Sequence, residues 1–231
     1  MRIIIELPTW LGDSVMTSPA IENLCKNIND LKIFLIGSKV SIEVLNNHPN
    51  VVDSTEIDKN YFNLYKQIKG MGHFDLFISF RSSFRSKFIK FVVSSNIKYQ
   101  YDKTKYLHGH QVEKYNNFIN DCLKINSKVG HLILHQSKII KNRPKKILGI
   151  NPGASYGSAK RWYPKKFAQV ASVLSSEYDI VIFGGPNEKN IAFDIESNLI
   201  RSGVRNYRNL SDQNSIKELM KNISDLDLFI T

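Results

Sequence analysis

Short segments rich in β-branched and aromatic residues alternate along this chain with segments of helical periodicity. The predicted strands of the first half cover residues 2–7, 32–36, 51–57, 75–80 and 97–101. The helices between them are predicted to begin near Ser14, Lys39, Tyr61 and Ser83, and a further helix covers residues 111–123. Strands that alternate with helices form a parallel sheet with helices on both faces. The chain is therefore predicted to be an α/β protein that begins with a doubly wound, Rossmann-like domain.

A charged segment that contains Pro144, residues 138–146 (KIIKNRPKK), is the best candidate for a linker. A second α/β unit follows, with strands predicted over residues 146–150, 179–183 and 225–231 and helices over 164–175, 188–200 and 215–223. We therefore divide the chain into domains 1–140 and 141–231. Since a complete domain of this kind needs roughly 150 residues, the 231 residues are expected to hold one full domain and an incomplete second one.

The strand predicted at 146–150 runs into a turn of small residues and then into a basic helix start, in the sequence NPGASYGSAKRWYP of residues 151–164. Small side chains let an anion approach backbone N–H groups, and a helix N-terminus adds a favourable dipole. Lys160 and Arg161 supply positive charge, and Ser155 and Ser158 supply hydroxyl donors. This layout predicts a phosphate-binding site. The alternative is that the two basic residues are only solvated surface, and Trp162 is interpreted as a packing residue.

A second motif, Trp10-Leu11-Gly12-Asp13, follows the first predicted strand. Gly12 leaves room for a ligand to approach the turn. Asp13 stands where this turn meets a helix N-terminus, which makes it a candidate general base. The alternative is that Asp13 only caps that helix, because aspartate is a favoured cap residue.

Taken together, the two motifs resemble those of the heptosyltransferases of glycosyltransferase family 9, which build the inner core of bacterial lipopolysaccharide. The nearest type is heptosyltransferase II, which adds the second heptose. The segments RSSFRSKFIKF (residues 81–91) and GGPNE (residues 184–188) also resemble family segments, in the expected order. The resemblance implies a GT-B fold of two Rossmann-like domains that face each other across a cleft. The N-terminal domain would bind the acceptor and the C-terminal domain the nucleotide sugar.

The resemblance also implies roles for individual residues. Asp13 would be the catalytic base and Lys160 would contact the donor phosphates. Glu188 corresponds to an acidic family residue near the ribose of the donor, although an acidic residue at a helix start is also a common cap. With Gly12, the acceptor site would include a basic cluster that holds phosphates or carboxylates of the lipopolysaccharide, and its alternative interpretation is a solvated helix face; the cluster is Arg81, Arg85 and Lys87. No metal and no cofactor are expected, in agreement with a metal-independent, inverting mechanism.

Net charge points to an anionic partner, since the chain carries a formal charge of +11 and a pI near 9.5. No nucleic-acid recognition pattern is present, so nucleic acid is not expected as a partner. The apolar run of residues 3–5 is too short for a signal peptide or a membrane span. We therefore expect a cytoplasmic protein at the inner face of the inner membrane.

The cysteines and histidines suggest no further site. Cys25 and Cys122 have no metal-ligand spacing and indicate no disulfide framework. His108 and His110 flank a glycine on a loop and are interpreted as structural or exposed.

The expected function is transfer of L-glycero-D-manno-heptose from ADP-heptose to the first heptose of the lipopolysaccharide or lipooligosaccharide inner core. One alternative is a related transferase that uses another nucleotide sugar or acceptor. The other is a truncated, non-catalytic chain that only binds nucleotide, glycolipid or protein. It arises because the family continues beyond the last strand into a Gly-Asp-Ser-Gly loop and a histidine-bearing helix that hold the donor, whereas this sequence stops at Thr231.

Overall fold

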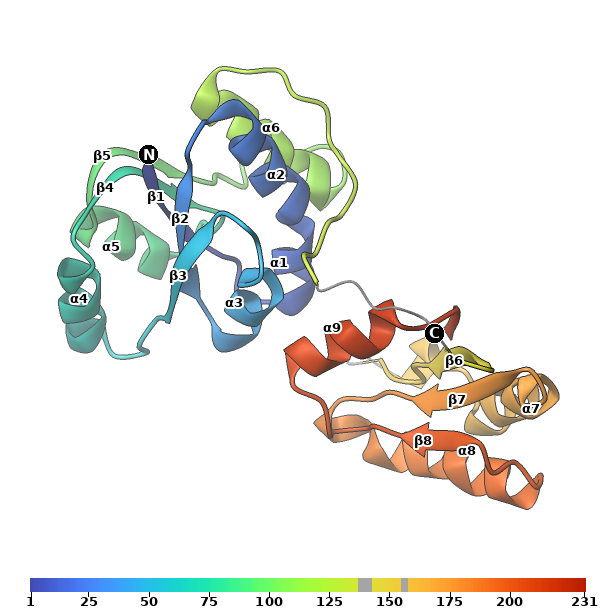
Figure 1. The fold of residues 1–231 in the computed structure, drawn as a ribbon. Helices are drawn as coiled ribbons and strands as arrows, with labels where there is room; N and C mark the ends of the chain where they lie inside the picture. Colours follow the sequence, from blue (N-terminus) through green and yellow to red (C-terminus); the bar gives the residue numbers. More distant parts are fainter. Residues whose placement is uncertain (137–142, 155–157) are drawn as a thin grey trace. The chain divides into compact units, whose positions relative to one another are not determined.

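The chain divides into two compact units, residues 1–136 and 137–231, each built from parallel strands and helices. A computed structural model describes residues 1–136, 143–154 and 158–231 (Figure 1). Most of the linker predicted at 138–146 lies outside the described residues. Arg143, at its described end, donates hydrogen bonds to Asp225 Oδ1 at 2.6 Å and Asp227 Oδ2 at 2.5 Å, so it is anchored on the second unit.

The first unit is built on a parallel sheet with the strand order β3-β2-β1-β4-β5. Its strands are β1 (Arg2–Glu6), β2 (Lys32–Gly37), β3 (Val51–Glu56), β4 (His73–Ser79) and β5 (Ser94–Gln100). The central strand β1 pairs with β2 and β4, so that Ile4 lies between Phe34 and Phe77. Because helices cover both faces, the side chains of residues 3–5 are fully buried whichever way they point.

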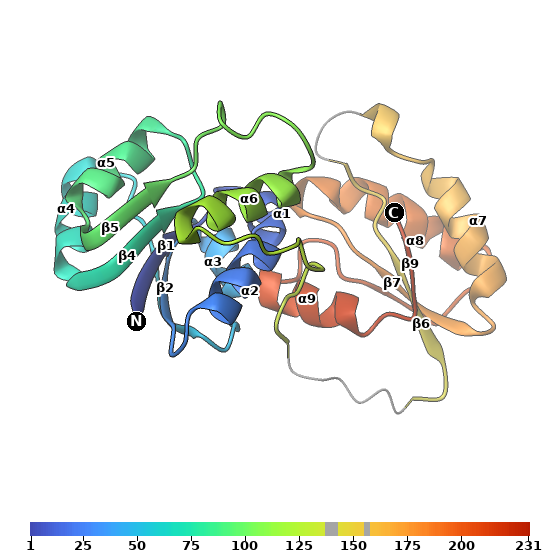
Figure 2. The same cartoon turned by 90° about the horizontal axis from the view of Figure 1, so that it is seen from above.

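Helices pack on both faces of this sheet. The helices are α1 (Leu11–Met16), α2 (Ser18–Asn27), α3 (Lys39–Leu45), α4 (Tyr61–Gly70), α5 (Phe84–Val92) and α6 (Gln111–Leu123). Helices α4 and α5 cover one face, and the other four cover the opposite face (Figures 1 and 2). Under α4 and α5 the core is formed by residues from both layers, among them Ile4, Ile36, Leu64, Phe77 and Ile89.

The helix predicted to start near Ser14 differs from the structure, because it begins at Leu11 and is divided into α1 and α2 at Thr17. Pro19 explains the division, since it has no N–H to donate to the carbonyl of Val15 four residues earlier. The Thr17 hydroxyl instead donates to the Ser14 carbonyl at 2.7 Å. The predicted starts of the later helices are confirmed, since α3 and α4 begin at Lys39 and Tyr61 and α5 directly follows its cap Ser83.

The second unit repeats the architecture with the strand order β8-β7-β6-β9. Its strands are β6 (Lys146–Ile150), β7 (Tyr178–Ile182), β8 (Tyr207–Asn209) and β9 (Leu228–Ile230). Helices α7 (Pro164–Leu174) and α8 (Lys189–Arg201) cover one face, and α9 (Ile216–Ser224) covers the other. Two 3₁₀ helices, η1 (Ser158–Lys160) and η2 (Pro186–Glu188), follow β6 and β7.

The strand β8 was not predicted from the sequence. It is three residues long and partly exposed at the edge of the sheet, so it lacks the apolar run that marks a buried strand. The predicted fold class, α/β with two Rossmann-like parallel units, is confirmed. Within the described ranges, no helix is both long enough and apolar enough to cross a membrane.

Candidate active site

A cavity opens at the carboxyl ends of the central strands of the first unit. In open α/β sheets ligands bind where the strand order reverses, and here β1 and β4 are the neighbours whose following helices cover opposite faces. The cavity has a volume of about 600 Å³. It is lined by residues that follow β1, β4 and β5 and by one end of α6, namely Pro8, Thr9, Trp10, Asp13, Phe80, Arg81, Ser82, Ser83, Tyr101, Lys103, Tyr106, Gln111, Lys114 and Tyr115.

Asp13 lies in the first turn of α1 and is half-buried at the cavity wall. Trp10, not Asp13, is the N-cap residue of this helix. None of the described residues forms a hydrogen bond or an ion pair with the Asp13 carboxylate. Beside it, no described atom outside the immediate neighbours lies within 4 Å of the position that a Cβ on Gly12 would take. The carboxylate is therefore available to a ligand in an open part of the cavity.

Three tyrosines form an aromatic wall of the same cavity. The rings of Tyr101 and Tyr106 are stacked with centroids 5.4 Å apart, and Tyr115 meets Tyr101 edge-on at 5.2 Å. Burial raises the pKa of the Tyr115 phenol, and the nearby charge of Asp13 raises it further. Tyr115 therefore stays protonated at neutral pH and keeps an O–H donor near Asp13.

Arg81 brings positive charge to the cavity from the loop after β4. Its Nη1 lies 3.5 Å from Oε1 of Glu6, which ends β1 and is fully buried. The hydroxyls of Ser79 and Ser86 donate to the two oxygens of Glu6 at 2.7 and 2.8 Å. Because a buried carboxylate needs such partners, these bonds connect β1 to β4 and α5 beneath the cavity and orient the Arg81 loop.

Burial raises the pKa of Glu6. The hydrogen bonds from Ser79 and Ser86 and the charges of Arg81 and Arg85 lower this pKa, but the effect of burial is larger. When folding raises the pKa of a carboxyl group, the protonated group stabilises the folded state. This contribution to the free energy of unfolding is complete below the ordinary pKa of 4.5 and is lost as the pH rises through the raised pKa. The ionised Glu6 side chain therefore weakens the fold at neutral pH.

We expect the Glu6→Gln variant to gain stability relative to the wild type as the pH rises, because glutamine keeps an acceptor for the serines but does not ionise. Each unit by which the pKa is raised corresponds to about 1.4 kcal/mol at neutral pH. Urea unfolding of both proteins from about pH 4 to about pH 8 measures the difference. The same difference in unfolding free energy at every pH would contradict the prediction.

The three residues of the predicted basic cluster, Arg81, Arg85 and Lys87, do not share one site in the structure. Arg81 lines the cavity, but Arg85 does not. Arg85 donates to the backbone carbonyls of Asp58 and Lys59 and lies over the ring of Tyr61. Lys87 is exposed and lines a smaller adjoining hollow of about 250 Å³. Of the three predicted cations, therefore, Arg81 shares the cavity with Asp13. Gly12 directly precedes Asp13 on α1.

Two lysines that the sequence did not single out replace the missing charges. Lys103 follows β5 and Lys114 lies on α6, and both line the cavity with Arg81. The signal that would have revealed them is topological, because both residues lie beyond the carboxyl end of a strand next to the reversal point. Glu6 carried a clearer signal, as an acidic residue that directly follows the apolar run of residues 3–5.

In the second unit, the loops after β6 and β7 meet at Gly153 and Glu188. A Cβ on Gly153 would collide with the Glu188 carboxylate in its present position, so the absence of a side chain at Gly153 allows this close approach. Glu188 Oε2 also accepts a hydrogen bond from the Gly185 N–H at 2.7 Å. Glu188 thus caps η2 and at the same time borders the loop that the sequence predicts to bind phosphate.

The cations of that loop behave differently. Lys160 ends η1 and is exposed, and none of the described residues forms an ion pair or hydrogen bond with its ammonium group. Arg161 is bound back to its own loop, because its Nη2 donates to the Ala154 carbonyl at 2.9 Å. Ser158 lies in η1, and Ser155 lies outside the described residues. Trp162 packs edge-on against Phe167 with ring centroids 5.2 Å apart.

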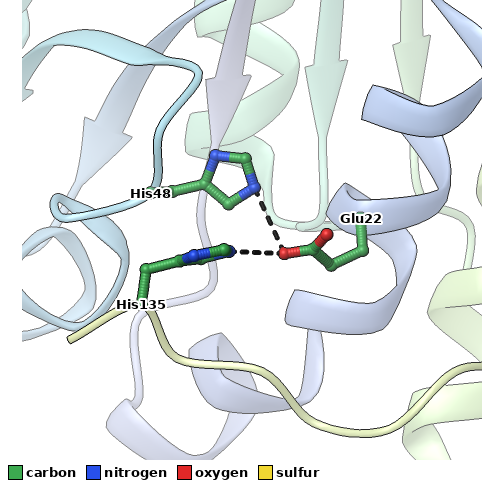
Figure 3. A group of neighbouring side chains, drawn as sticks. All are labelled: Glu22, His48 and His135. Atoms are coloured by element: carbon green, nitrogen blue, oxygen red, sulfur yellow. Dashed lines mark hydrogen bonds and ion pairs between the residues drawn. The ribbon is translucent and has the colours of Figure 1, made fainter. Parts of the chain in front are cut away.

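A second polar cluster lies elsewhere in the first unit, where Glu22 on α2 meets His48 and His135 (Figure 3). Among the described residues, these three place donor atoms within 4.8 Å of one another, as a metal site requires. Nε2 of His135 and Nε2 of His48 lie 2.6 and 3.4 Å from the same oxygen of Glu22. Cys25 Sγ lies 3.9 Å from His48.

The hydrogen bonds of His48 favour a structural role for this cluster. Its Nδ1 accepts the Asn50 N–H at 3.1 Å, which leaves the proton of the neutral ring on Nε2, facing Glu22. A metal ion on Nε2 would require the opposite arrangement, with Nδ1 carrying a proton. We therefore interpret the cluster as a hydrogen-bonded link that holds the segment around His135 to α2.

Comparisons with known proteins were consistent with one another. The sequence profile of glycosyltransferase family 9 (heptosyltransferase) matches residues 61–231. The lipooligosaccharide heptosyltransferase 2 of Campylobacter jejuni subsp. jejuni serotype O:2 is 41% identical over 241 residues, which cover 100% of this chain and 74% of that protein.

Two solved structures have a similar fold. E. coli ADP-heptose lipopolysaccharide heptosyltransferase II matches with a TM-score of 0.81 at 17% identity, over 99% of this chain and 78% of that one. E. coli heptosyltransferase WaaC with ADP-2-deoxy-2-fluoro heptose matches with a TM-score of 0.73 at 15% identity, over 99% and 82% of the two chains. At these identities the likeness concerns the fold.

Proposed function

The chain belongs to glycosyltransferase family 9, the heptosyltransferases, and from this premise we propose that it transfers L-glycero-D-manno-heptose from ADP-heptose to the first heptose of a lipopolysaccharide or lipooligosaccharide inner core. The heptosyltransferase 2 relative supports this choice of acceptor, and the WaaC complex supports an ADP-heptose donor. The observation that carries the proposal is the Asp13 carboxylate, which has no hydrogen-bond or ion-pair partner among the described residues and lies in a cationic cavity at the strand-order reversal of the first unit.

In the proposed reaction Asp13 removes the proton from the acceptor hydroxyl. The freed oxygen attacks the anomeric carbon of heptose, and the bond from that carbon to the ADP oxygen breaks with its electron pair on ADP. Attack from the side opposite ADP inverts the configuration. The mechanism needs no metal ion, because basic side chains neutralise the departing diphosphate.

We assign acceptor binding to the first unit. Gly12 leaves space beside the base, and Arg81, with Lys103 and Lys114, supplies charge for the phosphates or carboxylates of the core. Lys87 would extend this charge into the adjoining hollow. Arg85 is expected to contribute through the position of its helix, because its guanidinium is already bonded to backbone carbonyls.

Donor binding is assigned to the second unit. Lys160 is the proposed contact to the diphosphate, with Ser155 and Ser158 as hydroxyl donors. Arg161 shapes the loop through its bond to Ala154. Glu188, which borders Gly153, is the proposed contact to the ribose.

The acceptor is a lipid, so we propose that the protein acts peripherally at the inner face of the inner membrane. The formal net charge of +11 supports contact with an acidic lipid surface.

The test is ADP release from ADP-heptose with and without a mono-heptosylated lipid A core acceptor. We expect release that depends on the acceptor, with a disaccharide of heptose formed on the core. Release with another nucleotide sugar in place of ADP-heptose would contradict the proposed donor. Binding of both substrates by the folded protein without any release would contradict transfer and favour a binding function.

A further inference from the structure

Helices α4 and α5 present a set of exposed aromatic side chains on the first unit. Side by side, they form the whole helical layer on one face of its sheet (Figure 1). Phe84 and Phe91 are 80% and 84% exposed, and Phe62 is 65% exposed. We define the α4–α5 face as Tyr61, Phe62, Tyr65, Lys66, Lys69, Phe84, Lys87 and Phe91. Apolar side chains gathered at this exposure mark an interaction site.

Helix geometry places these residues on one surface. On α4 the buried residues Leu64 and Ile68 point to the sheet, so Phe62 and Lys66 lie on the far side. On α5 the buried residue Ile89 faces the sheet and Phe91 faces away. The two helices are joined at their contact by an edge-on pair, Tyr61 and Phe88, with ring centroids 5.1 Å apart.

The α4–α5 face is predominantly positive. Two carboxylates border it, since Asp58 accepts a hydrogen bond from Asn63 on α4 at 3.1 Å and Asp102 lines the same hollow as Lys87. Neither helix contains an aspartate or glutamate, and the acidic residue within residues 59–98 is Asp75, which accepts the N–H of Arg2 at 2.7 Å on the sheet. Lysines of the two helices also act on the neighbouring strand β5, where burial and the charges of Lys69 and Lys90 lower the pKa of Lys98. Lys66 lies 4.3 Å from the ring centre of Phe62, so charge and apolar surface are interleaved.

This combination fits an anionic lipid surface better than the other anionic partners. Aromatic rings partition into the bilayer interface, and lysines bind acidic headgroups. A second copy of this chain would bring lysines against lysines, which is unfavourable. Nucleic-acid bases stack on aromatic residues along a groove, whereas Phe84 and Phe91 project from a helix into solvent.

We propose that the α4–α5 face docks this protein on an anionic lipid bilayer, with its phenyl rings in the interface and its lysines against headgroup phosphates. The choice of the acceptor-bearing membrane as that bilayer rests on the proposed function. Docking itself depends only on the composition of the face.

Co-sedimentation with vesicles tests the docking. The vesicles contain phosphatidylglycerol mixed with phosphatidylcholine, or phosphatidylcholine alone. We expect the wild type to bind the mixed vesicles and to lose binding at high salt. Lys66→Glu combined with Lys69→Glu is expected to weaken binding by at least about 25-fold, since each lysine near the surface contributes about fivefold. Phe84→Ala combined with Phe91→Ala keeps the charge and is expected to weaken binding by about tenfold or more.

A matched control places the same charge change on the opposite helical layer, with Lys26→Glu and Lys39→Glu on α2 and α3. Binding that falls equally in this control would overturn the proposal, because the total charge would then be the cause. Unchanged binding in both α4–α5 variants, or salt-sensitive binding of a single-stranded oligonucleotide without vesicle binding, would overturn it as well. All variants change exposed side chains, and their thermal unfolding is compared with the wild type.

A soluble, deacylated core acceptor allows membrane docking and heptose transfer to be tested separately, because transfer to it requires no membrane. We expect the α4–α5 variants to transfer heptose to it at the wild-type rate while failing to bind vesicles. If the wild type transfers heptose to neither the lipid-bearing nor the deacylated acceptor, but the α4–α5 variants lose vesicle binding, the docking face is supported and the transferase function is contradicted. If the α4–α5 variants bind vesicles as well as the wild type and still transfer heptose, the transferase function is supported and the docking face is contradicted.

Discussion

Replacing Asp13 with asparagine is expected to slow heptose transfer by about 10²–10⁴-fold, which is the usual contribution of a general base. Asparagine has the same shape but cannot accept the proton of the acceptor hydroxyl. Because no described residue bonds to the Asp13 carboxylate, the substitution breaks no hydrogen bond, and the fold is expected to stay intact. The measurement is the steady-state rate of ADP release at saturating donor and acceptor.

The control for Asp13→Asn is Asp194→Asn, which makes the same chemical change on the exposed part of α8. It should transfer at the wild-type rate. Both variants are compared with the wild type by thermal unfolding, so that a loss of activity is not confused with a loss of fold. An Asp13→Asn protein that transfers as fast as the wild type would show that another group is the base.

Replacing Lys160 with alanine is expected to raise the KM for ADP-heptose by roughly 10- to 100-fold, since a hydrogen bond to a charged group contributes about 1.5–3 kcal/mol. Lys160 is exposed and has no partner among the described residues, so its ammonium group is free to meet a phosphate. The measurement is the dependence of ADP release on donor concentration, together with direct titration of ADP.

Lys165→Ala removes the same charge five residues later, from the exposed side of α7. If Lys160 binds the diphosphate directly, Lys165→Ala changes the KM only slightly. An equal rise in both variants would attribute the effect to the general positive field of the second unit. An unchanged KM in Lys160→Ala would remove Lys160 from the donor site.

The sequence predicted the central strands and most helix starts because each is a local pattern. The run of residues 3–5 reads as a buried strand, and Ser83 and Tyr61 mark helix starts that the structure confirms. The resemblance to the heptosyltransferases is also confirmed by the comparisons, since the motifs that carried it are continuous in sequence. Local order and short motifs can be read from neighbouring residues alone.

Other features depended on residues far apart in the chain. Glu6 bonds to Ser79 and Ser86, about eighty positions later, and no local pattern connects them. Arg85 was predicted beside Arg81 in the acceptor site, but the turn of α5 carries its guanidinium to the carbonyls of Asp58 and Lys59 instead. The position of a long side chain follows from its helix and its neighbours, which only the folded chain defines.

The sequence by itself determined the α/β class, the family and the two sequence motifs that carry the proposed chemistry. The order of the strands placed Asp13 and Arg81 in one cavity with Lys103, Lys114 and Tyr115, and it gathered the aromatic and basic residues of α4 and α5 on one layer. The physical reason is that hydrophobic periodicity specifies which side of each element is buried. Which elements become neighbours is decided by packing across the whole sheet, and that packing brings distant charges together.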